Sequence, residues 1–314
     1  MGKVDLTILV PAWNEERNIT SFLSDIADQL NYSSFKTDVI ILANGCVDNT
    51  IPLAKSHIQK QSLPNVSWLI QVFDDPFKNK VLNAGIELAK SDIILNLDAD
   101  SRLEKNCISR LYSFLLDNPK VNLVGGLDIP IYDKLNKETL LYQFQRTQQI
   151  WREERGRVMA IGAVMMYRKS SFNGFPLDAI SEDTWLSLYI ASKFGWESVK
   201  VLMDANIHIF APTSWSDYLK QQTRWDTGYV QLMKNHPELQ STYDNRRSLF
   251  KRRSNEEIFE SVYNRLDEEK IARSRLVELR DIINIIIEEN SDIEYDSILR
   301  NVGTWDPIIS TKGA

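Results

Sequence analysis

The stretch DIILNLDADS, residues 92–101, is an apolar run that ends in two carboxylates one residue apart. Short β-branched runs of this kind are typical of strands buried on both faces of a parallel sheet. Side chains two positions apart on a strand point to the same side, so Asp98 and Asp100 can face one ligand. Their repulsion calls for a positive partner, and a divalent cation gripped by hard oxygen ligands is one. A solvent-facing turn is the alternative interpretation.

Three further apolar runs, at residues 6–10, 39–42 and 68–72, come earlier, and segments with helical spacing separate them. This alternation predicts an α/β fold around a mostly parallel central sheet flanked by helices. Each run ends in a polar cluster, namely PAWNEE (11–16), ANGCVDNT (43–50), DDPFKNK (74–80) and DADS (98–101). Ligands bind beyond the carboxyl ends of such strands, so we expect the four clusters to share one edge of the sheet.

Composition excludes several classes of protein. The formal net charge of −6 argues against a general nucleic-acid binder, which needs a basic footprint. With only two cysteines there is no disulfide framework, and we expect a reducing, cytoplasmic setting. The first residues read as a core strand rather than a secretory signal, and no stretch approaches the roughly 18–20 apolar residues of a membrane helix.

Composition changes at about residue 236, where charged sequence with helical spacing begins. We therefore expect a catalytic or binding domain over residues 1–235 and a charged helical extension over residues 236–314. Ser254 and Glu257 have the spacing of a capping box, which predicts a helix from Asn255 to about Asn290. A basic patch within residues 246–253 is either a solvated face or a peripheral contact with anionic lipid at the inner face of a membrane.

Seven motifs, in this order, resemble the family-2 glycosyltransferases, inverting enzymes with a GT-A fold and nucleotide-sugar donors. The resemblance covers about residues 5–235. Its motifs are ILVPAWNEE (8–16), ANGCVDNT (43–50), KNKVLNAGI (78–86), DADS (98–101), AIGAVMMYRKSSFNGF (160–175), SEDTW (181–185) and QQTRW (221–225). A Rossmann-like GT-A domain is thus implied, followed by the helical extension.

The resemblance also implies a role for individual residues. Asp183 would be the catalytic base, and Asp100 with Asp98 would bind Mn²⁺ or Mg²⁺. The donor, a UDP-sugar, would be bound by Pro11, Asn14, Glu15, Asn44, Asp48, Lys78, Asn83, Asp98 and Arg224. The acceptor would be bound by Gly162, Glu182, Gln221 and Trp225. The acceptor itself would be a saccharide, a lipid-linked sugar or a small molecule, in the synthesis of a polysaccharide, glycolipid or glycoconjugate.

Simpler interpretations stand beside these roles. Glu182 and Asp183 would also suit the acidic first turn of a helix capped by Ser181. His208 is either a third metal ligand or a core histidine. For the whole chain, the alternatives are a nucleotidyltransferase, whose glycine-rich phosphate loop is missing from PAWNEERN (11–18), and a non-catalytic glycosyltransferase-like scaffold that acts through its helical extension.

Overall fold

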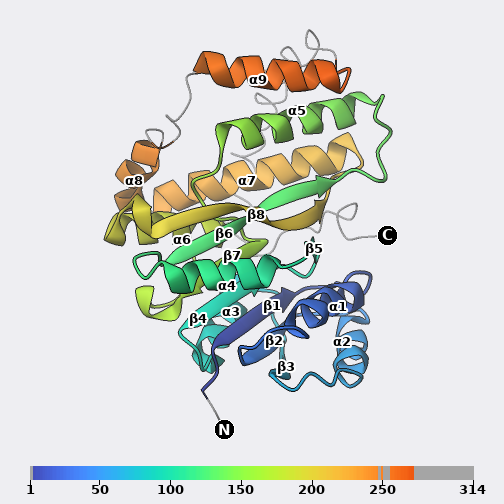
Figure 1. Ribbon diagram of the computed structural model, residues 1–314, viewed down its shortest axis with the longest axis vertical. Coiled ribbons are helices and arrows are strands. Elements are labelled where there is room, and N and C mark those ends of the chain that lie inside the picture. Colours follow the sequence, from blue (N-terminus) through green and yellow to red (C-terminus); the bar gives the residue numbers. More distant parts are fainter. Residues whose placement is uncertain (1–2, 247–248, 250–254, 272–314) are drawn as a thin grey trace.

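A single twisted sheet of eight strands organises the part of the chain that the structure describes, residues 3–246, 249 and 255–271 (Figure 1). The structure is a computed structural model. The strand order is β3-β2-β1-β4-β7-β6-β8-β5. The strands are β1 (Leu6–Ala12), β2 (Thr37–Asn44), β3 (Val66–Phe73), β4 (Ile93–Leu97), β5 (Ser101–Leu103), β6 (Leu123–Ile131), β7 (Val164–Arg168) and β8 (Val199–Phe210).

The first four strands in that order form the parallel half of the sheet, as the apolar runs predict. β1 pairs with β2 and with β4, and β2 pairs with β3, all in parallel. Every residue of β1 and of β4 is buried. Side chains alternate across the sheet: Leu6, Ile8 and Val10 join one apolar cluster, and Leu9 joins another. Since the strands are parallel, their carboxyl ends and the polar clusters after them lie on one edge.

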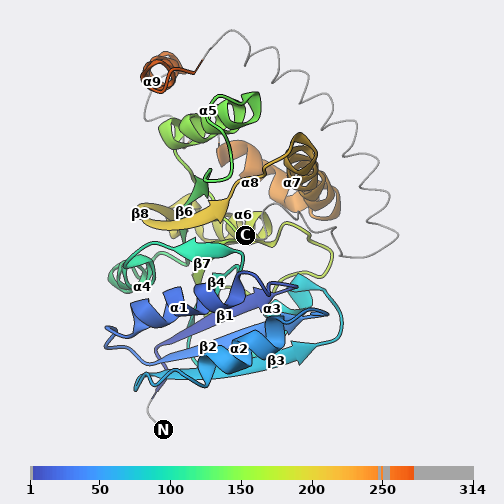
Figure 2. The ribbon, with the colours of Figure 1, turned by 90° about the vertical axis from the view of Figure 1, so that its right-hand side faces the viewer.

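Helices cover both faces of this half (Figure 2). The cluster beneath Leu6 is completed by α1 (Ile19–Leu30) and α4 (Cys107–Asp117), and α2 (Thr50–Ile58) packs against α1. The cluster around Leu9 is completed by α3 (Lys78–Leu88) and α6 (Glu182–Phe194). This arrangement confirms the expected α/β fold with a mostly parallel sheet flanked by helices.

The remaining strands make the sheet mixed. β7 runs antiparallel to both β4 and β6, while β6 and β8 are parallel neighbours. Three long helices belong to this half: α5 (Leu140–Arg155), α7 (Trp215–Asn235) and α9 (Asn255–Glu268). Figures 1 and 2 agree in placing α9 against α5, and the short α8 (Gln240–Asn245) follows α7. The described part of the C-terminal extension is therefore helical, as expected.

The last helix among the described residues is shorter than expected. α9 ends at Glu268, where Lys270 adopts φ 58° and the Ile271 amide donates to the Leu266 carbonyl at 2.8 Å. This left-handed residue closes the helix, so the prediction of one helix to about Asn290 is wrong at this point. The capping residue Ser254 and most of the basic patch 246–253 lie outside the described residues. Among the described helices, none is both long and apolar enough to cross a membrane.

Candidate functional site

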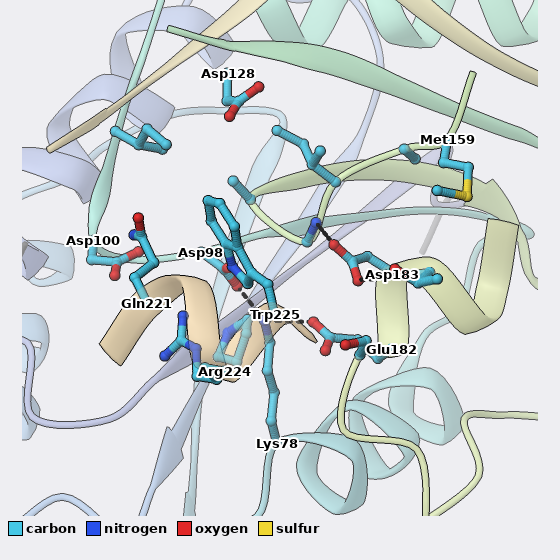
Figure 3. A pocket seen from close by; sticks show the side chains of 18 of the residues that line it. Lys78, Asp98, Asp100, Asp128, Met159, Glu182, Asp183, Gln221, Arg224 and Trp225 are labelled. Atoms are coloured by element: carbon cyan, nitrogen blue, oxygen red, sulfur yellow. Dashed lines mark hydrogen bonds and ion pairs between the residues drawn. The ribbon is translucent and has the colours of Figure 1, made fainter. Parts of the chain in front are cut away.

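A cleft of about 670 Å³ opens along the carboxyl edge of the sheet (Figure 3). It collects residues that lie far apart in the sequence, from the strand ends, from the loop before β7, from the start of α6 and from α7. Twelve of the predicted site residues line it: Pro11, Glu15, Asn44, Lys78, Asp98, Asp100, Gly162, Glu182, Asp183, Gln221, Arg224 and Trp225.

Lys78 connects the two sides of the cleft. It is the first residue of α3, and its Nζ lies 2.8 Å from Asp98 Oδ1 and 2.6 Å from Glu182 Oε1 (Figure 3). Burial alone would lower the pKa of the ammonium, but its attraction to Asp98 and Glu182 outweighs burial and raises the pKa above its usual value. Lys78 therefore stays charged and holds the end of β4 and the start of α6 together.

Asp98 and Asp100 end β4 inside the cleft. Burial raises the pKa of Asp98 to about 6, with Lys78 acting against the rise and Asp100 adding to it. Burial also raises the pKa of Asp100, against the positive charges of Lys78 and Arg224. Two partly buried carboxylates this close are unfavourable without further positive charge, and this is the environment that a divalent cation stabilises.

The oxygen ligands of this pair fit Mn²⁺ or Mg²⁺. Within the described residues no group of three or more His, Cys, Asp or Glu side chains could hold a metal alone. Mg²⁺ typically takes one or two protein carboxylates and completes its shell with water and substrate phosphates. The pair Asp98 and Asp100 therefore suits a cation that arrives with a phosphate ligand.

Asp183 is held rigidly at the start of α6. Its Oδ2 accepts a hydrogen bond from the Gly162 amide at 2.8 Å, and its Oδ1 accepts one from the Thr184 amide at 2.6 Å (Figure 3). Burial raises its pKa, and the neighbouring charge of Glu182 adds to the effect. Gly162 matters sterically as well, since a Cβ there would lie 3.1 Å from Glu182 Oε1. The carboxylate thus has a fixed position and an increased proton affinity, which are the properties of a general base.

Helix α7 supplies Gln221, Arg224 and Trp225 to the cleft. These residues share one helical face because their spacing of three to four matches one turn. The helix approaches α6 closely at Gly228, where an added Cβ would overlap the hydroxyl of Ser181. Glycine at this position allows the start of α6 and the α7 side chains to face the same space.

Four other candidates lie outside the cleft lining. Asn14, at φ 55°, accepts a hydrogen bond from the Val47 amide at 2.9 Å. Asp48 accepts from the Thr50 amide at 3.0 Å and from its hydroxyl at 2.6 Å at the start of α2. Asp48 also accepts from the Glu16 amide at 3.1 Å, so Asn14 and Asp48 both join the loop that carries Glu15 to the loop after Asn44.

Asn83 and His208 also make structural contacts. The Asn83 amide donates to the Phe175 carbonyl at 2.8 Å and accepts from the Phe175 amide at 2.7 Å. His208 lies on β8, with Nε2 4.0 Å from Glu104 Oε2. Neither residue is among those that line the cleft.

One predicted residue has an unusual environment. Asn44 Oδ1 is buried at the end of β2 and has no hydrogen-bond partner among the described residues. A buried, unpaired oxygen costs free energy in the absence of a donor. Because Asn44 lines the cleft, a ligand N–H is a natural partner for it.

The cleft also contains residues that were not predicted as site residues, among them the charged Asp128, Arg152 and Arg157. Asp128 is buried on β6 and forms an ion pair with Nη2 of Arg157. Gly156, at φ 81°, ends α5 and turns the chain so that Arg157 reaches the cleft. An acid inside the apolar run LVGGLDIPI was the available signal for Asp128, whereas the mixed sequence around the two arginines carries no pattern.

Comparison with known sequences gives a family match. The sequence model described as "Glycosyl transferase family 2" matches residues 7–175, more than half of the chain. A probable glycosyltransferase from Sulfolobus acidocaldarius is 22% identical over 240 residues, which cover 73% of this chain and 51% of the relative. An N-acetylglucosaminyltransferase from Rhizobium meliloti is 28% identical over 241 residues, which cover 69% of this chain and 54% of the relative. The chain thus spans about half the length of these relatives.

Two solved structures share the fold. A mannosyltransferase from Pyrobaculum calidifontis, in complex with GDP-Man and Mn²⁺, superposes with a TM-score of 0.61 at 15% identity, over 99% of this chain and 86% of that one. A glucosyl-3-phosphoglycerate synthase from Mycobacterium tuberculosis, in complex with Mn²⁺, UDP-Glc and phosphoglyceric acid, gives a TM-score of 0.52 at 16% identity, over 74% of this chain and 79% of that one. Both likenesses confirm the expected GT-A fold.

Proposed function

The chain belongs to glycosyl transferase family 2, and from that membership we propose that it is a metal-dependent, inverting glycosyltransferase with a nucleotide-sugar donor. The observation that carries the proposal is the placement of Asp183 in the same cleft as Asp98 and Asp100. A fixed carboxylate with a raised pKa thus faces a pair of carboxylates suited to a metal and a diphosphate.

We assign the donor to the strand-end side of the cleft. Asn44 would accept a hydrogen bond from the nucleobase, with a UDP-sugar as the first candidate. Asp98 and Asp100 would hold the cation, which, when bound, neutralises charge on the departing diphosphate. Arg224 would bind the diphosphate through its planar fork of donors. The Mn²⁺ complexes of the two structural neighbours, one with GDP-Man and one with UDP-Glc, support this class of donor and leave the base and sugar to experiment.

The transfer step follows from the position of Asp183. Its carboxylate takes the proton from the acceptor hydroxyl while that oxygen attacks the anomeric carbon. The bond between the anomeric carbon and the diphosphate oxygen breaks, its electron pair leaves with the diphosphate, and configuration inverts. The hydrogen bonds from the Gly162 and Thr184 amides fix the carboxylate for this task.

Lys78 would prepare the cleft for the donor. Without a ligand it balances Asp98 and Glu182, and it stays charged over the working pH range. When cation and diphosphate enter beside Asp98, the ammonium is close enough to turn toward the phosphate oxygens. Glu182 and Trp225 would then border the acceptor.

Three expectations from the sequence stay predictions. They are a peripheral membrane contact through residues 246–253, a cytoplasmic location and the domain boundary at residue 235.

The test is release of nucleoside diphosphate from a panel of nucleotide sugars, with Mn²⁺, with Mg²⁺ and with EDTA. The panel is run on the wild type, Asp100→Asn and Asp183→Asn. Asp75→Asn, in the exposed loop before α3 and outside the cleft, is the matched control.

We expect metal-dependent turnover of one donor, lost in the two cleft variants and kept in the control. Loss of turnover in Asp183→Asn with retained donor binding would place the defect in chemistry. Neither turnover nor metal-dependent nucleotide binding by the wild type would refute the proposal and favour a non-catalytic scaffold.

A further inference from the structure

Two arginines stand close together on the wall of the cleft formed by the end of α5. Arg152 lies in the last turn of the helix, and Arg157 follows the turn at Gly156. Both line the cleft, and neither matches a motif of the sequence analysis. Burial lowers the pKa of Arg157, and the like charge of Arg152 adds to this effect.

The guanidinium of Arg157 has an ion-pair partner at Nη2 but no hydrogen-bond partner at Nε among the described residues. Its Nη2 forms the ion pair with Asp128, and its side chain is 17% exposed. Its Nε is buried and has no hydrogen-bond partner among the described residues. Arg157 and Asp183 both line the cleft, and the charge of Asp183 acts on this guanidinium. A buried guanidinium N–H without an acceptor next to the proposed base indicates that a ligand oxygen belongs there.

Arg152 is less constrained. Its guanidinium carbon lies 5.4 Å from the centre of the Trp225 ring, a cation–π contact that orients the group across the cleft. Within the described part of the chain, no carboxylate forms an ion pair with Arg152, although the neighbouring Glu153 pairs with Arg146 and Arg265. Trp225 therefore holds an available guanidinium beside Arg157.

From these contacts we propose that the acceptor carries an oxyanion, a phosphate or a carboxylate, which binds Arg152 and Arg157 and brings the acceptor hydroxyl to Asp183. This inference rests on the proposed function and names its acceptor class. An arginine fork bonds two oxygens of such a group at once, and these charge-assisted hydrogen bonds are stronger than those to the neutral hydroxyls of a sugar. The negative charge would also relieve the repulsion between the two guanidiniums.

The donor diphosphate does not account for this pair. Arg224 is the arginine whose charge acts on Asp100, at the metal side of the cleft. Arg157 instead interacts with Asp128 on β6 and with Asp183 at the start of α6. The cleft thus has separate positive charges near the metal side and near the base, as a reaction between two anionic substrates requires.

Binding is tested first, by calorimetry with inorganic phosphate and with glycerol 3-phosphate, each with and without saturating nucleoside diphosphate and Mg²⁺. Glycerol is the neutral counterpart. We expect both anions, but not glycerol, to bind the nucleotide-loaded wild type. Arg152→Gln should weaken binding by about tenfold or more, because a hydrogen bond to a charged group is lost.

Two further variants separate the site from general effects. Arg157→Gln combined with Asp128→Asn removes the second guanidinium without leaving its carboxylate unpaired, and we expect it to lose binding too. Arg110→Gln is the control, because Arg110 lies on α4 outside the cleft, where its side chain is 42% exposed and its Nε lies 3.8 Å from Asp204 Oδ2. Anion binding that is absent from the wild type, or unchanged in Arg152→Gln and in the double variant, overturns the proposal.

Transfer then identifies the source of the anion. Phosphatidylglycerol against diacylglycerol in detergent micelles represents a lipid headgroup that carries a phosphate and a free hydroxyl, and glycerol 3-phosphate against glycerol represents a soluble acceptor. Preference for the anionic member of either pair, reduced in Arg152→Gln through KM, supports the proposal. Equal transfer to both members of each pair overturns it while leaving the proposed glycosyltransferase intact. Failure of metal-dependent nucleotide binding in the same calorimetry would instead count against the proposed function.

Discussion

Replacing Lys78 by methionine removes the only ammonium that bridges Asp98 and Glu182 in the described structure, and we expect the fold to lose stability. The side chains of Lys78, Asp98 and Glu182 are 35%, 25% and 8% exposed. Removing one partner costs about 3–5 kcal/mol for a fully buried pair, while an exposed pair contributes about 0–1 kcal/mol. Since Lys78 is one-third exposed and Glu182 is almost fully buried, we expect an intermediate loss of about 2–3 kcal/mol at neutral pH.

The loss should depend on pH. The pKa of Asp98 is raised to about 6 by burial even though Lys78 lowers it, so the variant will raise it further. A carboxyl whose folded pKa lies above its unfolded value favours folding at low pH, and this contribution is lost as the pH rises through the folded pKa. Protonation can therefore compensate for the missing ammonium in acid but not in mild base. The difference from wild type should be small near about pH 5 and largest near about pH 8.

The assay is urea unfolding followed by tryptophan fluorescence at both pH values. Lys80→Met is the matched control, two residues along the same helix, where Nζ lies 3.1 Å from Asp75 Oδ2 and the two side chains are 57% and 71% exposed. We expect this control to lose less than about 0.5 kcal/mol. A Lys78→Met midpoint equal to wild type at the higher pH, or an equal loss at both pH values, would refute the electrostatic reasoning.

Three further predictions concern activity and packing. Asp183→Asn should lower kcat by about 10²–10⁴-fold with donor affinity unchanged, as measured by steady-state kinetics and calorimetry. Burial raises the pKa of Asp183, and a general base acts in its deprotonated form. The apparent pKa of the acidic limb of the wild-type kcat/KM profile should therefore exceed the ordinary aspartate pKa of about 3.9. An apparent pKa equal to that value would contradict the assignment. Gly228→Ala should overlap Ser181, shift the start of α6 and reduce kcat, whereas an unchanged kcat would show that α7 can retreat without consequence. Arg265→Ala should remove the ion pairs between α9 and the carboxylates of α5. We expect the free energy of unfolding to fall by about 1 kcal/mol and the acceptor KM to rise. A difference in unfolding free energy that does not change with salt concentration would argue against an ionic cause.

The parallel half of the fold could be predicted because its information is local. Each strand from β1 to β4 is a short apolar run followed by polar residues, and parallel pairing brings those endings to one edge. This rule places Asp98, Asp100 and the segment that carries Lys78 at the same edge, whereas Glu182 beside Lys78 was predicted only from the family resemblance. Asp183 and Arg224 needed the family resemblance, because their positions relative to β4 depend on packing between α6 and α7.

The wall of the cleft that carries Arg152 and Arg157 could not be predicted from the sequence, because its contacts are long-range. Arg157 pairs with Asp128 on a different element, and Arg152 is oriented by Trp225 from α7. No periodicity marks such pairs. For Asn14 the prediction named a residue that does not line the cleft. Asn14 matches a donor motif, yet its side chain accepts a hydrogen bond from the neighbouring loop.

The contact between α9 and α5 has a consequence for the order in which the chain matures. Arg265 bonds Glu153 across 112 positions, and Arg146 bonds Glu269 across 123. During synthesis the four parallel strands have all emerged once Leu97 has left the ribosome, so the edge that carries the acidic pair can form early. The wall that carries Arg152 gains its brace only after Glu269 follows. A nascent chain should therefore assemble the edge that carries Asp98 and Asp100 before the wall that carries Arg152 is held in place.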